Sequence, residues 1–336
     1  MQRRAFTLLV AATVVSVAAA AVALTTGGGT VTRAAQGQRA LPDLAPNLAQ
    51  LAWVRINRGT MKANFSQVGG KWGLVEKGNY PIDEKKMRRL LLALADLTLI
   101  EPKTQRPELY SRLDVDDPVN GKATEVTLQD RTGKVVGQII VGRSRPNRLG
   151  MGNDGVYVRR IGENRAWLAR GAVDVGGDAV DWLQRRIVDI PAGRIASMVF
   201  AGDQGVAVIS RKSAEAKFAV DNAPGDAKFK DEAALAMPAA ALERLDLTDV
   251  KPAADQPVPD TGVDTAAFTT LDGLTVRIKL FERDKQEWVL IEAAGKSDEA
   301  KALNDRVGRW AYAIPVERAK LLRTKLADLL QPAGGS

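Results

Sequence analysis

Hydrophobic and polar residues alternate along several short stretches of this chain, which is the pattern of a β-strand with one buried face. Three such stretches, WVRINR, KANFSQV and KWGLVEK, follow one another from Trp53, and the Gly-Gly pair at 69–70 predicts a hairpin turn between the last two. A helical pattern follows Asp83, with apolar residues every three or four positions over Met87–Leu97. The sequence therefore predicts three strands and then an amphipathic helix with Asp83 as its N-cap.

The same series of elements is predicted again after residue 190. IASMVFAG, GVAVISR and KFAVD are three short strands, and a segment rich in alanine and leucine follows, in which Pro238 is expected to interrupt the helix. Three pairs of positions share one sequence offset: Asp83 and Asp231, Leu94 and Leu242, and Leu97 and Leu245. We therefore expect an α+β fold of two tandem related modules of antiparallel sheet with packed helices, over residues 51–190 and 191–331.

Further elements complete both modules. The first half contains four more predicted strands: Glu125–Gln129, Val135–Val141, Gly155–Arg160 and Ala166–Ala169. In the second half, GLTVRIKLF and EWVLIEA repeat the central hairpin of the first module, and RWAYAIP stands where NRAWLA stood. A final helix is expected over Val316–Leu330 with one buried face made by Val316, Ala319, Leu322, Leu326 and Leu329. The proline-rich segment VKPAADQPVPDTG is expected to be a surface loop.

The N-terminal residues have a different character. Two arginines precede an uncharged stretch over Ala5–Leu24, and about twenty helical residues reach roughly 30 Å, enough to cross a membrane. Residues 1–25 are therefore expected to be an export signal that remains as a transmembrane anchor or is cleaved near Ala23. Residues 26–50, rich in glycine, alanine and proline, are expected to form a flexible stalk outside the cytoplasmic membrane.

The composition limits the available chemistry. The 336 residues include 45% hydrophobic and 26% charged residues, which is typical of globular domains, and contain neither histidine nor cysteine. The chain therefore has no thiolate nucleophile, no imidazole base and none of the usual nitrogen or sulfur ligands of zinc. Catalysis would have to use carboxylates or a Ser/Lys pair. We expect a protein that is not an enzyme and that needs no cofactor or metal.

Three motifs bear a superficial likeness to functional sites. GMGNDG at Gly150–Gly155 matches a dinucleotide-binding pattern but opens a predicted strand instead of a helix, so a hairpin loop is expected. DVDDPVNG, starting at Asp114, lacks the turn glycine of a calcium loop. Ser213 and Lys217 have helical spacing but lie in a polar stretch that leads into a strand. The six tryptophans lie within strand or helix patterns and are expected in the core.

A basic run offers a candidate binding face. The isoelectric point of the chain is about 9.6, and the segments GRSRPNR and VRRIGENR carry five arginines that we name as a possible face for an anionic partner: Arg143, Arg145, Arg148, Arg159 and Arg160. For an exported protein, nucleic acid is not an expected partner. Lipid head groups, anionic envelope polymers and acidic protein surfaces are the anions available there, and the run is alternatively only solvated surface.

Several segments in this order resemble the family called DUF4340: GKWGLVEKGNYPIDEKKMRRLLLALADLTLIEPKT, PELYSRLDVDDP, VYVRR, AWLARG and DWLQRRIVDIP. The resemblance is strongest from Trp72 to Pro191. It implies a bacterial, membrane-anchored extracytoplasmic protein associated with ABC-type transport systems of the gliding-motility kind. It supplies no activity, cofactor or catalytic residue to carry over.

These observations lead to one main functional hypothesis and two alternatives. The main hypothesis is a non-catalytic periplasmic component of an ABC-type transport or cell-envelope assembly, anchored to the inner membrane, or secreted if it is cleaved, and binding a membrane protein such as a permease. The first alternative is the binding of an anionic envelope polymer or lipid head groups through the five arginines. The second is a hydrolase that uses carboxylates.

Overall fold

The computed structural model describes residues 35–119, 121–150, 154–223, 225 and 227–331. Contacts divide the chain into two compact units. Unit 1 comprises the chain up to Glu76 and Ile82–Trp182, and unit 2 comprises Lys77–Pro81 and the chain from Leu183 onward. The predicted signal or anchor at 1–25 lies outside the described residues. Within the described part of the chain, no helix combines the length and apolar character needed to span a membrane.

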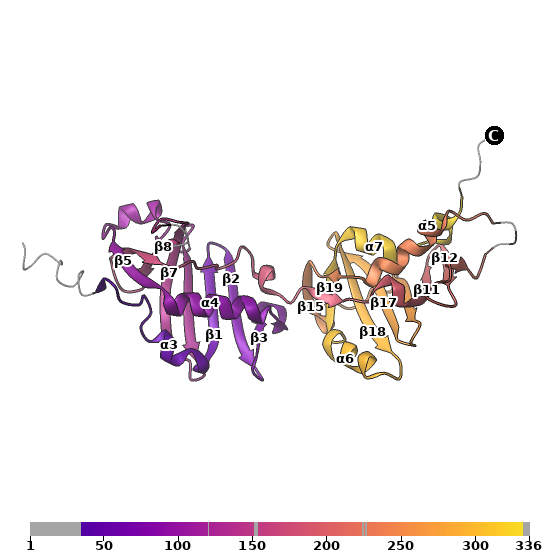
Figure 1. The fold of residues 1–336 in the computed structure, drawn as a ribbon, viewed down its shortest axis with the longest axis horizontal. Helices are drawn as coiled ribbons and strands as arrows, with labels where there is room; N and C mark the ends of the chain where they lie inside the picture. Colours follow the sequence, from indigo (N-terminus) through magenta and orange to yellow (C-terminus); the bar gives the residue numbers. More distant parts are fainter. Residues whose placement is uncertain (1–34, 120, 151–153, 224, 226, 332–336) are drawn as a thin grey trace, which may run out of the picture. The chain divides into compact units, whose positions relative to one another are not determined.

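Unit 1 is an antiparallel sheet with helices α3 and α4 on one face (Figure 1). The order of its strands across the sheet is β3-β2-β1-β6-β7-β8-β9-β5. Its strands are β1 (Leu51–Arg58), β2 (Met61–Val68), β3 (Lys71–Leu74), β5 (Thr98–Pro102), β6 (Thr124–Asp130), β7 (Val135–Arg145), β8 (Gly155–Arg160) and β9 (Ala166–Arg170), and its helices are α3 (Leu44–Asn47) and α4 (Glu84–Asp96).

The predicted first helix is confirmed as α4. The carboxylate of Asp83 accepts hydrogen bonds from the backbone N–H groups of Lys85 and Lys86, at 2.9 and 3.1 Å, and so satisfies two donors that the first turn leaves free. The apolar stripe is buried as expected, through Met87, Leu90, Leu91 and Leu94. The hairpin turn is also confirmed, because Val68 pairs with Lys71 across Gly69 and Gly70, which both have positive φ.

Removing this cap gives a testable prediction. Asp83→Ala is expected to lower the free energy of unfolding by about 1 kcal/mol, because two N–H groups of the helix lose their acceptor. Asp43 is the matched control, since it occupies the N-cap position of α3 but forms no side-chain cap hydrogen bond. Urea unfolding followed by circular dichroism measures both variants, and equal losses would show that the Asp83 cap contributes nothing.

Unit 2 is a second antiparallel sheet with strand order β13-β12-β11-β16-β17-β18-β19-β15, beside a two-stranded sheet of β10 and β14. Its strands are β4 (Tyr80–Pro81), β10 (Arg186–Val188), β11 (Ile195–Gly202), β12 (Gly205–Ser210), β13 (Ala219–Val220), β14 (Leu245–Asp246), β15 (Asp249–Pro252), β16 (Asp264–Thr270), β17 (Thr275–Arg283), β18 (Gln286–Ala294) and β19 (Trp310–Ile314). Its helices are α5 (Glu232–Ala236), α6 (Asp298–Val307), α7 (Val316–Leu322) and α8 (Leu326–Leu329). As expected, Pro238 limits the helix after Asp231, since α5 gives way to a 3₁₀ helix over Met237–Leu242.

Each sheet has a second face that a loop covers only in part. In unit 1, Tyr110 and Val115 of the segment after β5 pack over Ile140 and Tyr157 of β7 and β8. In unit 2, two valines of the loop before β16, Val258 and Val263, pack on a cluster that contains Phe281 and Trp288. The strands outside these clusters keep an uncovered outer face in both units.

The stalk predicted over residues 26–50 is wrong for its last part. Ala40, Leu41 and Leu44 are buried, and the N–H of Ala40 donates to the carbonyl of Leu97 at 2.6 Å. The physical reason is the apolar side chains of LPDLAPNLAQL, which let α3 pack against α4 and β7. This segment therefore belongs to unit 1.

The helix predicted over Val316–Leu330 is two helices. Arg323 leaves the helical conformation after α7, with φ −102° and ψ 24°, and the chain turns before α8 begins. Ala319, Leu322 and Leu329 are buried, but Val316 is 54% exposed and does not belong to the buried face. The loop predicted at VKPAADQPVPDTG includes β15 residues and a short 3₁₀ helix over Ala253–Asp255.

An ion-pair cluster in unit 2 predicts a pH dependence of stability. Arg194 pairs with Asp272 at 2.7 Å and with Glu299 at 2.9 Å. Hydrogen bonding to Arg194 lowers the pKa of Glu299, and hydrogen bonds from Thr270 and Arg194 lower the pKa of Asp272. A carboxyl whose pKa is lower in the folded state stabilises the fold above its unfolded pKa, and this contribution is lost as the pH falls through the folded pKa.

We therefore expect the wild-type protein to lose more unfolding free energy below about pH 4.5 than the Arg194→Met variant does. The difference is small, because all three side chains are partly exposed. Urea unfolding at several acidic pH values measures it. Parallel pH profiles for the two proteins would contradict the role given to Arg194.

Candidate functional site

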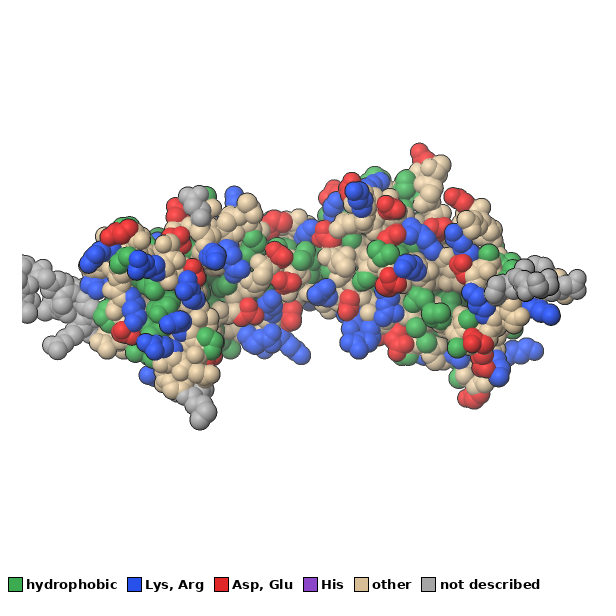
Figure 2. Space-filling view, turned by 90° about the horizontal axis from the view of Figure 1, so that it is seen from above, with side chains coloured by type: hydrophobic (Ala, Val, Ile, Leu, Met, Phe, Trp, Pro, Cys, Tyr) green, Lys and Arg blue, Asp and Glu red, His purple; other side chains and the backbone are tan. Residues whose placement is uncertain are grey.

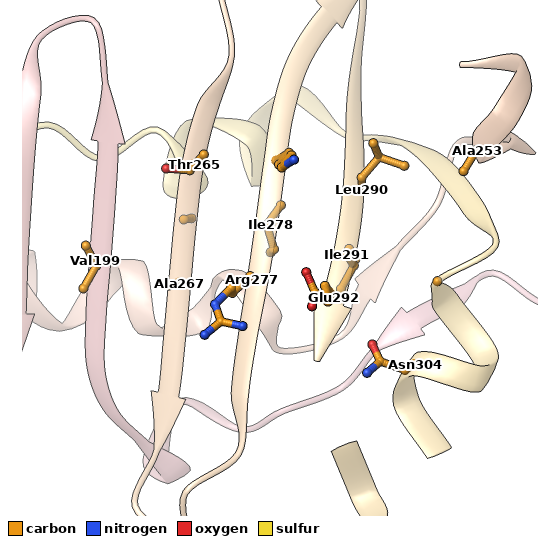
Figure 3. Close-up of a pocket in the computed structure, with 13 residues that line it drawn as sticks. Val199, Ala253, Thr265, Ala267, Arg277, Ile278, Leu290, Ile291, Glu292 and Asn304 are labelled. Carbon is orange, nitrogen blue, oxygen red and sulfur yellow. The ribbon is translucent and has the colours of Figure 1, made fainter. Parts of the chain in front are cut away.

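A groove of about 720 Å³ lies on the outer sheet face of unit 2 (Figure 3). Its floor is formed by β11, β16, β17 and β18, and α6 contributes Asn304 to its wall. Because side chains alternate along a strand, burial of Met198 and Phe200 in the core turns Val199 outward. In the same way, burial of Phe268 turns Ala267 into the groove.

The register of the strands arranges the lining in two parallel rows. One row crosses the four strands as Val199, Ala267, Arg277 and Glu292. The neighbouring row crosses three of them as Thr265, Lys279 and Leu290. The first row thus has apolar side chains on β11 and β16, and both rows place a cation on β17.

The charged side chains of the groove have no partners within the described part of the chain. Arg277, Lys279 and Glu292 are exposed and form no hydrogen bond or ion pair there, although Arg277 and Glu292 are direct neighbours on β17 and β18. Asn304, in contrast, is held in place, since its side-chain oxygen accepts from the N–H of Ala293 at 2.7 Å. The groove therefore combines a fixed wall, a small apolar floor and one net positive charge.

Sequence comparison places these elements in a family. Residues 72–265, more than half of the chain, match the family model described as "Domain of unknown function (DUF4340)". The chain belongs to the DUF4340 family. No curated protein and no solved structure matches the chain. Within this DUF4340 protein, the match runs from β3 to the start of β16, so it includes β11 of the groove but not β17 or β18.

The five arginines named from the sequence do not lie on one face of this DUF4340 protein. Arg159 and Arg160 are consecutive residues of β8, so their side chains point to opposite sides of the sheet. The guanidinium of Arg160 donates to the backbone carbonyls of Arg39 and Ala40, both at 2.8 Å. Arg159 donates to the carbonyl of Val115 at 2.9 Å and lies over the ring of Tyr110. Both arginines hold neighbouring segments of unit 1.

The other three arginines are more accessible. Arg143 forms an ion pair with Asp114 at 3.0 Å, which raises its pKa, and Arg145 lies over the ring of Tyr157. Arg148 is exposed in the turn after β7. Figure 2 shows basic and acidic side chains interspersed over the face in view. These three arginines remain available to an anion, without the continuous five-residue face that the sequence suggested.

Ser213, Lys217 and a partly buried pair of carboxylates in unit 2 are occupied by structural contacts. Lys217 pairs with Glu232 at 2.8 Å, and the Ser213 hydroxyl bonds Glu215. The carboxylates of Asp264 and Glu287 both pair with Arg323, at 2.7 and 2.5 Å. Among the described residues, no group of three or more acidic side chains is placed to hold a metal ion.

Proposed function

We propose that this protein is a non-catalytic accessory component of a membrane-associated assembly, and that it binds a partner protein in the outer groove of unit 2. The observation that carries the proposal is the groove itself, with an uncovered floor of small side chains beside Arg277 and Lys279. An apolar patch bordered by charged side chains is typical of an interaction site, and in unit 2 the loop before β16 covers only the part of this sheet face near Trp288.

The charge of the groove indicates the chemistry of the partner. Arg277 and Lys279 carry two positive charges and Glu292 one negative charge, and none of them is neutralised by an ion pair within the described residues. A segment that places small apolar side chains on the floor at Ala267 and a carboxylate opposite the two cations complements both features. The proposed occupant is therefore an extracytoplasmic segment of a membrane protein with apolar and acidic residues.

Location and partner class rest on the sequence. The uncharged stretch over Ala5–Leu24, preceded by two arginines, supports export and anchoring to the inner membrane, or secretion if the segment is cleaved near Ala23. The DUF4340 resemblance supports an ABC-type permease or a related envelope component as the partner. In this account, the anchor holds the chain at the outer surface of the cytoplasmic membrane, in the periplasm, next to the permease.

We also infer that the two units are related modules. Adding ten to each strand number of the order β3-β2-β1-β6-β7-β8-β9-β5 gives the order of unit 2, which supports descent from one repeated unit. The first strands support it too, since the register shifts between Leu51 and Trp53 in β1 and between Ile195 and Ser197 in β11. On this basis the hairpin of β17 and β18 corresponds to β7 and β8, one strand later than the sequence pattern suggested.

Binding of an anionic envelope polymer is the second candidate. It is supported by Arg145 and Arg148, which are exposed and have no ion pair within the described residues. Because exposed charges are screened beyond about 10 Å at 0.1 M salt, such binding weakens steeply as salt rises. Retention on a polymer column that persists at high salt would exclude this candidate.

Crosslinking in native membranes tests the main proposal. The full chain is purified after crosslinking, its partners are identified by mass spectrometry, and its N-terminus is determined from the same sample. We expect recovery of a permease subunit together with a chain that retains its N-terminal segment. Recovery of the protein alone, as a soluble product that begins near Leu24, would contradict both the partner and the anchor.

A further inference from the structure

The outer face of unit 1 carries an exposed tryptophan, Trp53, although its place in a strand pattern predicted a core position. Trp53 is 44% exposed, whereas the other five tryptophans are buried at 8% or less. The reason lies in the alternation of β1, where Val54 and Ile56 face the core and turn Trp53, Arg55 and Asn57 outward. An indole at the surface needs an explanation, because it leaves a large apolar area in water.

The side chains around Trp53 are polar, and many are amides. A shallow groove of about 480 Å³ is lined by Trp53 and by amide, cationic and apolar neighbours: Val54, Arg55, Asn57, Lys62, Asn64, Val75 and Gln129. The register sets Gln129 directly beside Trp53 on β6, and Asn64 beside Arg55 on β2. Asn57 lies opposite Lys62. The register thus places one amide, Gln129, directly beside the indole, while Asn64 and Asn57 line the same groove further along the strands.

Hydrogen bonds within the face fix several of these groups. The Asn64 side chain accepts from Arg55 at 3.1 Å, and its backbone N–H donates to Glu76 at 3.1 Å. On β6, Glu125 accepts from Gln138. Arg55 and Lys62 lie in the groove lining, and two carboxylates adjoin it, since Glu76 bonds Asn64 and Glu125 lies opposite Asn57. The face as a whole therefore carries no net charge. Gln129 lies beside Trp53, and among the described residues its side chain bonds only the carbonyl of Gly133, at 3.3 Å, while Asn57 lies four residues further along β1.

We infer that this face is a binding site for a neutral oligosaccharide, with a pyranose ring stacked on Trp53. The C–H face of a pyranose is apolar and packs on an indole. The hydroxyl or acetamido groups at the edge of the ring need hydrogen-bond donors and acceptors, and each amide side chain supplies both. The charge balance of the face favours an uncharged sugar over the anionic polymer considered for Arg145.

Tryptophan fluorescence measures binding at this face directly. Because the other tryptophans are buried, a saccharide that stacks on Trp53 changes the fluorescence of that indole selectively. The probes are hexasaccharides of glucose and of N-acetylglucosamine, titrated into the full chain in detergent at low and at high salt. We expect a saturable fluorescence change with at least one of them, with an affinity that does not depend on salt.

Three variants test the assignment to this face. Trp53→Ala is expected to weaken binding, measured by calorimetry, by about tenfold or more, and the double variant Asn57→Ala/Gln129→Ala by a comparable factor. Val206→Ala is the control, because Val206 is a 46% exposed side chain on β12 of unit 2; it should leave the affinity unchanged. Circular dichroism verifies the fold of each variant.

Two results would overturn the inference. The first is the absence of a saturable signal with either hexasaccharide at about 10 mM, well above the dissociation constant expected of a weak site. The second is an unchanged affinity in a folded Trp53→Ala variant. Neither result bears on the partner protein of unit 2, because the saccharide and the partner are assigned to different units and are measured with different probes.

Discussion

Replacement of Trp182 by alanine is expected to lower the free energy of unfolding of unit 1 by about 3–5 kcal/mol. Trp182 is fully buried, its ring lies 5.2 Å from that of Phe65, and the ammonium of Lys86 lies over it at 4.7 Å. Gly176 approaches its indole so closely that a Cβ there would stand 2.6 Å from Nε1. The indole N–H has no hydrogen-bond partner among the residues that the structure describes, so the loss comes from packing.

Trp53→Ala is the matched control for this prediction. It removes the same side chain from unit 1, but from a position that is 44% exposed, so its cost should be well below that of Trp182→Ala. Urea unfolding, with hydrogen exchange of peptides from β2 and α4 as the local readout, compares the two. Equal losses would show that Trp182 does not organise the helix-covered face of the sheet.

Reversal of two charges in the groove of unit 2 is expected to reduce partner capture by about tenfold or more. Arg277→Glu/Lys279→Glu leaves the apolar floor intact and turns two positive charges into negative ones, which repel an acidic partner. Neither residue is buried or has a hydrogen bond within the described residues, so the fold should not change. Crosslinking yield from native membranes, at low and at high salt, is the measurement.

A second double variant controls for net charge. Lys212→Glu/Lys230→Glu makes the same change in charge in unit 2, on exposed lysines that are not in the groove. Its yield should match that of the wild-type protein. Similar losses in the two double variants would assign the effect to overall charge and would contradict a specific role of the groove.

Local sequence patterns predicted the elements whose cause is local. Gly69 and Gly70 specify a tight turn, and Asp83 caps α4, because each effect depends on residues a few positions apart. The α+β class follows from the same patterns, and the structure confirms antiparallel sheets with a few helices. The short strand β5 was missed because it is defined by its pairing with the distant strand β9. Helix α6 was also missed, although Ala300, Leu303 and Val307 have helical spacing and are buried.

The candidate sites were less predictable, for two different reasons. The rows of the unit 2 groove depend on the register of four strands, which no single segment specifies. The errors at Arg159, Arg160 and Trp53 were avoidable, since strand alternation already separates the two arginines and places Trp53 opposite Val54 and Ile56. Two-residue alternation in each predicted strand predicts that Arg159 and Arg160 lie on opposite faces of the sheet and that Trp53 lies on the outer face.

A photo-crosslinking amino acid at Ala267 gives the most direct test of the proposed docking site. Ala267 lies at the centre of the groove floor, between Val199 and Arg277 (Figure 3), and the same probe at Lys212 serves as the control. Illumination of native membranes is predicted to join Ala267, and not Lys212, to a membrane protein. Failure of the Ala267 probe to join any protein, or equal labelling from both positions, would contradict the proposal that this groove binds the partner.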